Sequence, residues 1–395
     1  MKKRVMLEAI ATLSGTIIGA GVLAIPYSFM KAGFLTGLLN LIILSVAIYF
    51  VYLYMGEIVL RTKGKKQLTG YAEKYLGKKG KALMAFSMIF GIYGALIAYL
   101  IGVGRSLNAL FHFPSLEVFG AFIPAEILAA FVFFIVASII VYFGLKIIKT
   151  SELLMGAIVV SIMLLIFILS FLKIDFANLV SFNISNVFLP YGVVLFALSG
   201  AVAISEMEEE LVKNKKHLKK AIIIGTLIPI VFYFLFALTV VGNCGILTSE
   251  IATTCLMAKY GVIMMILGNL FPIFAMSTTF FTLGLGLKQM FNYDYKFPHF
   301  ISWLMTVMVP FSLFLWIFFF VKQEIFFKTI DLTGGIAMTL EGILIILMFY
   351  AAKRKGDRKP EYEMKYSKIL STIIMILFFL GMIYTILFFF GILKI

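Results

Sequence analysis

Four features of this 395-residue chain carry the residue types that could do chemistry. The run GTIIGAGVLAIP, residues 15–26, puts three glycines and a proline inside an apolar stretch. The run ALSGA, residues 197–201, puts small residues in the middle of another. The run AMSTT, residues 275–279, supplies three adjacent hydroxyls, and Glu341 lies near the centre of GGIAMTLEGILIIL. Backbone groups, hydroxyls and a carboxyl group suit the binding of polar ligands and ions.

Residues typical of catalysis are missing from the long apolar runs. The three histidines lie in loops or at the ends of these runs, without metal-ligand spacing: His112, His217 and His299. No GxxxxGK[ST] phosphate-binding loop occurs. The two cysteines, Cys244 and Cys255, share one loop, where a disulfide and two free thiols are both open alternatives. We therefore expect that the protein is not an enzyme and binds no cofactor other than an ion.

The composition predicts an all-α polytopic membrane protein. Hydrophobic residues make up 62% of the chain and charged residues 13%, whereas soluble domains are roughly half apolar and about a quarter charged. Apolar runs of about 20 residues, enough to cross a bilayer, recur along the chain. The first run continues to Phe34 without a cleavage site, so we expect a span and not a removed signal peptide. Eleven spans are expected, near residues 6–31, 35–60, 82–110, 124–143, 151–172, 188–206, 221–242, 261–287, 300–321, 332–351 and 369–392.

Basic residues predict the orientation of these spans. The chain has 34 lysines and arginines. All but seven fall in the N-terminal segment and in every second loop; the exceptions are Lys31, Arg105, Lys173, Lys259, Lys322, Lys328 and Lys394. This bias predicts a cell-membrane protein with a cytoplasmic N-terminus and an extracellular C-terminus. The net charge of +15 then reflects topology and anionic lipid headgroups, so it needs no nucleic acid to explain it.

A weak internal repeat predicts that the chain has two related halves. The small-residue runs interrupt the first and the sixth expected spans, five spans apart. Because five is odd, the second unit is inverted relative to the first, and matching broken helices in inverted halves point to a transporter's binding site. The expected units are residues 1–173 (spans 1–5), 174–352 (spans 6–10) and 353–395 (a charged cytoplasmic loop and span 11).

The glycines of residues 15–26 indicate a break in the first span. A glycine costs about 1 kcal/mol against alanine inside a helix, and irregular backbone at bilayer depth is tolerated only beside protein or a cavity. Free N–H groups at the start of the second half-helix suit a carboxylate. Free carbonyls at the end of the first suit an ammonium group or a cation. The alternative is a close-packing face at Gly15-x-x-x-Gly19; the partner break in span 6 favours an unwound segment.

Several stretches resemble the amino acid/auxin permease family of the amino acid–polyamine–organocation superfamily. They are GTIIGAGVLAIPYSFMKAGF, LPYGVVLFALSG, EEELVKNKKHLKKAIIIGTLIPIVFY and FAMSTTFFTLGLGLKQMF. The resemblance covers nearly the whole chain and is closest to the branch of tryptophan and tyrosine permeases, from which SGAVAISEMEEEL departs. It implies a leucine-transporter-like fold, a 5+5 inverted repeat with an eleventh transmembrane helix.

The resemblance also implies where a substrate binds. It assigns the substrate carboxylate to the N–H groups of Ala20 and Gly21, in the segment that begins at Gly19. It assigns the amino group to carbonyls of Ile17 and of span 6, near Phe196 and Ser199. Phe196 matches an aromatic gate, and small residues follow it and leave space for a sizeable side chain: Ala197, Gly200 and Ala201.

For a coupling ion, the resemblance points to oxygens of two spans. Relatives that use sodium take carbonyls at the positions of Gly15 and Ile18, and ligands of the AMSTT run, here Ala275, Ser277, Thr278 and Thr279. Hydroxyl and carbonyl oxygens suit a hard cation such as Na⁺. The alternative is that these hydroxyls bond back to their own helix.

Glu341 is the corresponding candidate for H⁺, because ionisable groups inside spans are functional candidates; a structural glutamate is its alternative. The sequence leaves Na⁺ and H⁺ both open.

These observations predict a secondary active amino acid transporter. We expect an ion-coupled symporter that imports its substrate by alternating access and works as a monomer in the lipid bilayer. The expected substrate is a neutral amino acid, with hydrophobic and aromatic side chains as candidates. A sensor that binds an amino acid without transporting it is the alternative, because both would use the same site.

Overall fold

The computed structural model describes residues 2–118, 121–211, 214–320 and 325–393. Its α-helices are α1 (Lys2–Ile17), α2 (Gly21–Ala32), α3 (Phe34–Arg61), α4 (Leu68–Phe111), α5 (Ala125–Phe143), α6 (Leu145–Phe171), α7 (Tyr191–Ala197), α8 (Ala201–Glu210), α9 (Leu218–Cys244), α10 (Thr253–Tyr260), α11 (Val262–Gln289), α12 (His299–Phe320), α13 (Ile325–Thr333), α14 (Thr339–Lys355) and α15 (Lys368–Phe389). Shorter elements are the 3₁₀ turns η1 (Phe176–Leu179), η2 (Ile184–Asn186), η3 (Lys215–His217) and η4 (Gly245–Leu247), the π-helical turns η5 (Met290–Asp294) and η6 (Gly334–Met338), and the strands β1 (Leu116–Val118) and β2 (Ala121–Ile123), which pair antiparallel.

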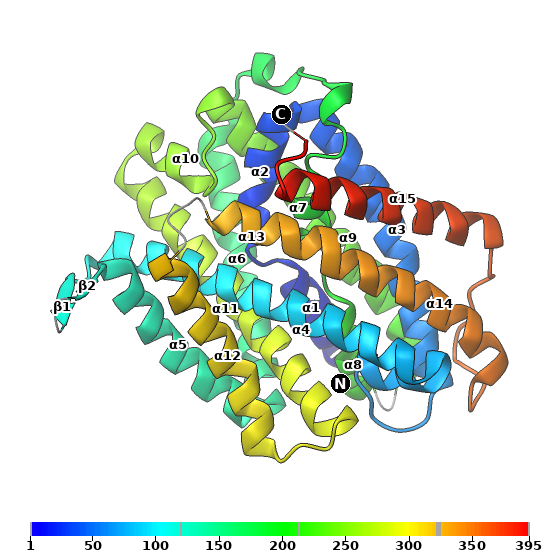
Figure 1. Ribbon diagram of the computed structural model, residues 1–395. Coiled ribbons are helices and arrows are strands. Elements are labelled where there is room, and N and C mark those ends of the chain that lie inside the picture. Colours follow the sequence, from blue (N-terminus) through cyan, green and yellow to red (C-terminus); the bar gives the residue numbers. More distant parts are fainter. Residues whose placement is uncertain (1, 119–120, 212–213, 321–324, 394–395) are drawn as a thin grey trace.

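The helices form one bundle that agrees with the predicted spans. Among the described residues, ten helical segments are long and apolar enough to cross a membrane, and the bent pair α1–α2 makes up to eleven. In Figure 1, α4 and α14 cross the front of the bundle, and α1 and α8 lie in its interior. The described ends of the chain lie on opposite sides of the bundle. The all-α polytopic fold predicted from the composition is therefore confirmed.

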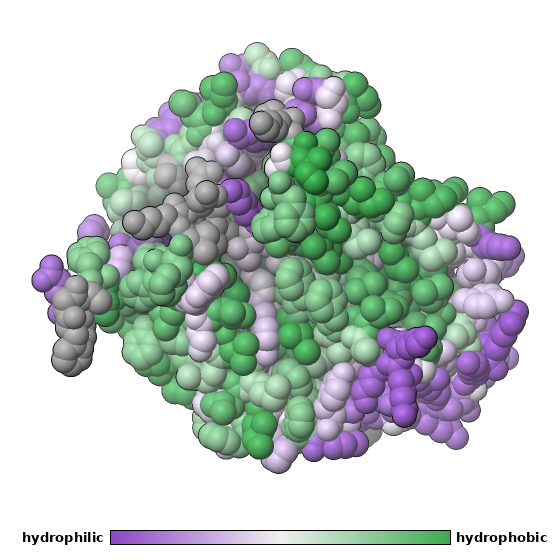
Figure 2. All heavy atoms as spheres, in the orientation of Figure 1, coloured by the Kyte–Doolittle hydropathy of each residue, from purple (hydrophilic) through white to green (hydrophobic). Residues whose placement is uncertain are grey.

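The outer surface of the bundle is apolar, as a lipid-facing surface must be. Figure 2 shows hydrophobic residues over most of the visible face, with hydrophilic residues gathered where α14 leads into α15. On α5, for example, Val132, Ile135 and Ile139 are exposed, whereas Ala130 and Ala137 are buried. Small residues on the buried side let neighbouring helices approach closely.

Two spans are broken at their middles, where the runs of small residues predicted irregular backbone. The axes of α1 and α2 differ by 49° across residues 18–20. The helices α7 and α8 are likewise separated by residues 198–200. A third irregularity was not expected from the sequence: the span of α13 and α14 passes through the π-helical turn η6. Such turns are frequent at functional sites.

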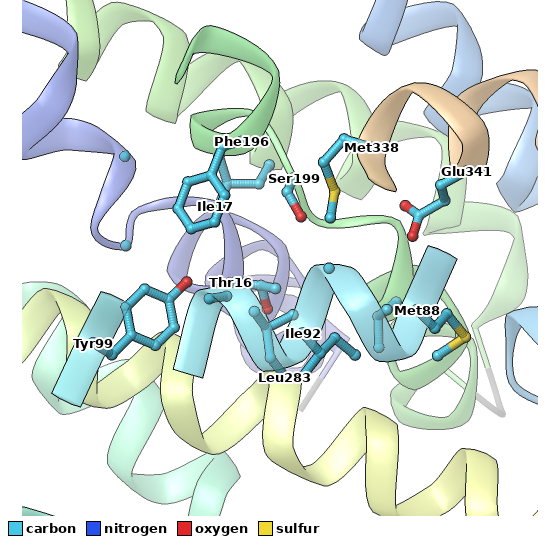
Figure 3. A pocket seen from close by; sticks show the side chains of 15 residues that line it. Thr16, Ile17, Met88, Ile92, Tyr99, Phe196, Ser199, Leu283, Met338 and Glu341 are labelled. Carbon is cyan, nitrogen blue, oxygen red and sulfur yellow. The ribbon is translucent and has the colours of Figure 1, made fainter. Parts of the chain in front are cut away.

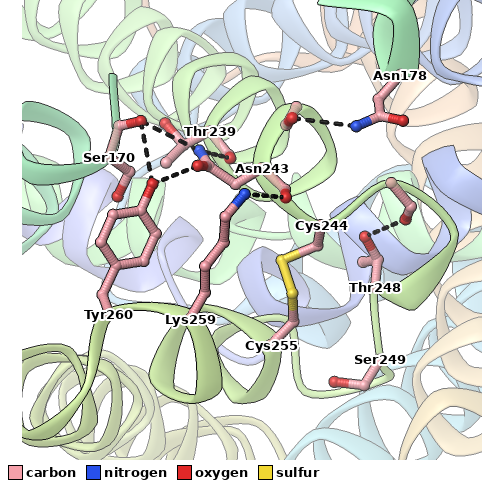
Figure 4. The surroundings of a disulfide bond; sticks show 12 residues. Ser170, Asn178, Thr239, Asn243, Cys244, Thr248, Ser249, Cys255, Lys259 and Tyr260 are labelled. Atoms are coloured by element: carbon pink, nitrogen blue, oxygen red, sulfur yellow. Dashed lines mark hydrogen bonds between the residues drawn. A yellow bond between two sulfur atoms is a disulfide. The ribbon is translucent and has the colours of Figure 1, made fainter. Parts of the chain in front are cut away.

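The loop between α9 and α10 is closed by a disulfide, which decides between the two alternatives that the sequence left open. Cys244 ends α9 and Cys255 lies in α10, and their sulfurs are bonded. Figure 4 shows Lys259 beside this bond, donating from Nζ to the carbonyl of Asn243 at 2.8 Å. The Asn243 side chain donates in turn to the Thr239 carbonyl at 2.8 Å. Helix α10 is thereby fixed to the end of α9.

At the opposite end of the bundle, a buried carboxylate holds the loop between α14 and α15. Glu57 in α3 is 0% exposed and pairs with Arg61 at 2.8 Å and Lys353 at 2.6 Å. It also accepts a hydrogen bond from the N–H of Met364. Tyr362 of the same loop donates to the Leu53 carbonyl at 2.8 Å. Because a buried charge needs such partners, these contacts fasten the loop to the end of α3.

Candidate functional site

The two broken spans meet at the centre of the bundle. A β-carbon added to Gly21 would lie 2.4 Å from the Cα of Ala197. One added to Gly200 would lie 2.7 Å from Cγ1 of Ile17. Gly21, after the first break, therefore touches the backbone that precedes the second break. Gly200, in the second break, touches the side chain that precedes the first. Only glycine fits at these two contacts.

The break in the first span leaves backbone donors free. Within the described part of the chain, no backbone hydrogen bond uses the N–H of Gly19, Ala20 or Gly21. The first turn of α2 is closed instead by bonds from Val22 to Gly19 and from Leu23 to Ala20, at 3.3 and 3.1 Å. Free N–H groups at the start of a helix carry partial positive charge and favour an anionic group.

The carbonyls at the ends of α1 and α7 are held by two buried tyrosines. The Tyr233 hydroxyl in α9 lies 2.6 Å from the Ile17 oxygen and 2.8 Å from the Ala197 oxygen. Its single proton is thus shared between the two breaks. The Tyr52 hydroxyl in α3 donates to the carbonyl of Leu198. Each carbonyl keeps a second lone pair for another donor.

A cluster of oxygens joins α1 to α11 beside the first break. Oγ1 of Thr279 lies 3.1 Å from each of three carbonyl oxygens, those of Gly15, Ile18 and Ala275. Oγ1 of Thr278 donates to the Ala275 carbonyl at 2.8 Å. The structure thus brings together five of the oxygen ligands expected for a hard cation.

Ser277 does not join this cluster, because its hydroxyl donates to the Ile273 carbonyl of its own helix at 2.6 Å. No group of three or more His, Cys, Asp or Glu residues that could hold a metal ion occurs among the described residues. The oxygen cluster therefore suits a hard cation rather than a transition metal.

A narrow pocket lies between the breaks and α4 (Figure 3). Its volume of about 10 Å³ holds roughly one water molecule. Six residues expected from the sequence line it: Ile17, Gly19, Gly21, Phe196, Ser199 and Glu341. Three other expected residues are buried without lining it: Ala20, Ala197 and Gly200. The remaining lining residues are Thr16, Met88, Gly91, Ile92, Ala95, Tyr99, Val202, Leu283 and Met338.

One face of α4 forms the wall opposite the breaks. Its lining residues recur every three or four positions, the spacing of a helix face, from Met88 to Tyr99. Figure 3 shows the Tyr99 hydroxyl at one end of the pocket and the Glu341 carboxylate at the other. A β-carbon at Gly19 would lie 2.9 Å from both the Tyr99 hydroxyl and Oγ1 of Thr279. The pocket therefore abuts the oxygen cluster at its Tyr99 end.

Two buried carboxyl groups of the α13–α14 span face the broken helices. Asp331, 8% exposed, accepts a hydrogen bond from the N–H of Val193 at the start of α7. Asp331 was not singled out because it lies just before the predicted start of span 10. Glu341, 7% exposed, lines the pocket, and no hydrogen bond or ion pair within the described residues uses its carboxylate.

Comparison with known proteins groups this chain with membrane permeases. The sequence profile of the tryptophan/tyrosine permease family matches residues 2–387. Glutamine transporter 2 of Aliivibrio fischeri is 25% identical over 235 residues, which are 58% of this chain and 59% of that protein. Amino acid transporter ANT1 of Arabidopsis thaliana is 32% identical over 111 residues, 27% of this chain and 26% of that protein. The chain thus spans less than two thirds of either relative.

A longer match and a solved structure extend this grouping. Tyrosine-specific transport system 1 of Haemophilus influenzae is 24% identical over 293 residues, 70% of both chains. The crystal structure of MhsT in complex with L-phenylalanine superposes with a TM-score of 0.69 at 14% sequence identity, over 96% of this chain and 98% of that chain. The predicted leucine-transporter-like fold is therefore confirmed.

Gly21→Ala tests the contact between the two breaks. The added methyl group would collide with the backbone of Ala197, so we expect a loss of about 1–3 kcal/mol in stability and a lower melting temperature in detergent. Gly15→Ala is the matched control, since nothing lies within 4 Å of a β-carbon there. Equal melting temperatures for the two variants would contradict the close approach of α2 and α7.

Proposed function

This chain belongs to the tryptophan/tyrosine permease family, and we propose that it imports an amino acid together with a coupling ion. It is a transporter of the amino acid permease group and not an enzyme. The observation that carries the proposal is the pair of facing breaks, with free N–H groups on one side of a pocket and an oxygen cluster beside them. One site thereby offers oxygen atoms that can bind a cation and N–H groups that can donate to a carboxylate.

The substrate is an amino acid bound by its two charged ends. Its carboxylate meets the N–H groups of Ala20 and Gly21, where α2 begins. Its ammonium group meets the second lone pair of the Ile17 carbonyl and the carbonyls around Phe196 and Ser199. The free N–H groups and the unfilled lone pairs support this assignment. Mainly apolar walls support a neutral side chain.

The pocket must widen to take this substrate. At about 10 Å³ it is too small for an amino acid, so we take this conformation to be a contracted one. Met88 and Met338 line it, and methionine side chains have three rotatable bonds and move at low cost. Residues 1–173 and 174–352 act as the two repeats of alternating access, and residues 353–395 add the last loop and span.

The coupling ion binds between α1 and α11. The carbonyls of Gly15, Ile18 and Ala275 and the hydroxyls of Thr278 and Thr279 supply oxygen ligands, which favours Na⁺. H⁺ is the other candidate ion, with Glu341 as its carrier. The oxygen cluster beside the first break is the observation that favours Na⁺ over H⁺.

Uptake into proteoliposomes tests the transport function. We expect a neutral labelled amino acid to accumulate when an inward Na⁺ gradient is imposed at constant pH, because the ion and the substrate bind adjoining residues. A proton gradient alone should give at most basal uptake. Binding without accumulation under either gradient would contradict transport.

Thr279→Ala tests the oxygen cluster. The change removes the hydroxyl that lies 3.1 Å from three carbonyls, so we expect the Na⁺ concentration for half-maximal uptake to rise about tenfold, equivalent to ~1.4 kcal/mol. Ser277→Ala is the control, because that hydroxyl bonds only within its own helix in the described structure. The cluster is not the ion site if both variants keep the same Na⁺ dependence.

The N-terminus is cytoplasmic and the C-terminus extracellular, and the protein works as a monomer. The distribution of basic residues supports the orientation, as does a disulfide in a loop expected outside, where oxidising conditions keep it intact.

Thiol labelling of sealed right-side-out vesicles tests this orientation. The chain has only two cysteines, and they are bonded to each other. A membrane-impermeant maleimide should label the protein only after an impermeant reductant is added. Labelling that requires permeabilised vesicles would place the loop inside, and labelling without reductant would mean that the disulfide is absent.

A further inference from the structure

Two polar side chains in the pocket have no hydrogen-bond partner within the described part of the chain. Glu341 in α14 is 93% buried, since it is 7% exposed. The Ser199 hydroxyl lies in the break between α7 and α8. Both line the same pocket. Figure 3 shows the carboxylate and the hydroxyl on the same side of the pocket, with the Met338 side chain between them.

The hydroxyl that lies beside the second break, near Gly200, is already used elsewhere. The Tyr52 hydroxyl donates to the Leu198 carbonyl. Among the residues that the structure describes, none donates a hydrogen bond to Glu341 and none forms an ion pair with it. A buried polar group without a partner costs roughly 1–3 kcal/mol, which favours a partner supplied from outside the chain.

Glu341 and Ser199 together can accept one hydrogen bond from a ligand and donate another to it. Glu341 can accept a hydrogen bond whether it is ionised or neutral, whereas a serine hydroxyl can donate one. A primary amide matches both groups, since its NH₂ group can donate to Glu341 and its carbonyl can accept from Ser199. An ammonium group would satisfy the carboxylate and could donate to the hydroxyl oxygen, but it leaves the hydroxyl proton without an acceptor, and an alkyl side chain satisfies neither group.

We propose that Glu341 and Ser199 bind the side-chain amide of the substrate, so that the transporter selects neutral amino acids with a primary amide. The amide NH₂ donates to Glu341 and the amide carbonyl accepts from Ser199. Met338, which now lies between the two groups, swings aside when the substrate enters. This inference rests on the proposed transport function and narrows its substrate class from neutral amino acids to glutamine and asparagine.

Competition for uptake tests the assignment with the full-length protein in proteoliposomes. Glutamine is compared with norleucine, an apolar side chain of similar length, and with lysine, a cationic one. We expect half-maximal uptake at a concentration about tenfold or more lower for glutamine than for norleucine, the effect of one hydrogen bond to a charged group. A wild-type protein that prefers norleucine or lysine to glutamine would overturn the amide assignment.

Variants test the two groups separately. Glu341→Met should lower the preference for glutamine over norleucine by about tenfold to a hundredfold while norleucine uptake persists. Ser199→Ala should lower the same ratio by about threefold to tenfold, and it serves as an independent test if Glu341→Met does not fold. Glu117→Met is the matched control, because Glu117 is exposed in β1.

The outcomes separate this inference from the proposed function. An unchanged ratio in Glu341→Met, with melting like that of the wild type, would overturn the role of the carboxylate. If the wild-type protein neither binds nor accumulates any amino acid of the panel, the proposed function fails. If it accumulates norleucine as well as glutamine, transport stands and the amide site is wrong.

Discussion

The structure depends on one hydroxyl that bridges two broken helices. Two membrane spans give up regular helix at their middles, and the backbone groups this frees must be satisfied inside the protein because lipid offers no partner. Tyr233 lies 2.6 Å from the Ile17 oxygen and 2.8 Å from the Ala197 oxygen, so it serves the ends of both first half-helices at once. Gly21 and Gly200 then allow the two broken spans to touch. Free N–H groups are left on the opposite side of the break, where a ligand can use them.

The same short segment links the proposed ion and substrate sites. Gly15 and Ile18 direct their carbonyls toward Thr279, while Ile17, between them, directs its carbonyl toward Tyr233. A cation bound by the first two carbonyls would fix the backbone on both sides of the third. A ligand that orders a segment lowers the cost for a second ligand of the same segment. Coupling between ion and substrate then needs no long-range pathway, because the two bind neighbouring residues of one break.

Short sequence runs predicted more of this arrangement than the identity of single residues did. Runs of small residues located both breaks, since glycine is unfavourable within a helix, and the Thr279 hydroxyl lies beside the carbonyls of Gly15 and Ile18, with which the resemblance had grouped it. Tyr52 and Tyr233 were not predicted, because a tyrosine in an apolar span has the same pattern whether it packs or bonds a distant carbonyl. The resemblance grouped Ser277 with the threonines, but the helix turns its hydroxyl to its own backbone. The π-helical turn at Gly334–Met338 has no simple sequence pattern.

A structure of the protein with a bound amino acid measures the central claim most directly. The account predicts that the ligand's carboxylate lies within hydrogen-bond distance of the N–H groups of Ala20 and Gly21, with the ammonium group facing the carbonyls at the ends of α1 and α7. It also predicts that the pocket is wider than the volume of about 10 Å³ that it has here. A ligand bound outside the two breaks, or a continuous helix through residues 18–20 in the bound state, would contradict the account.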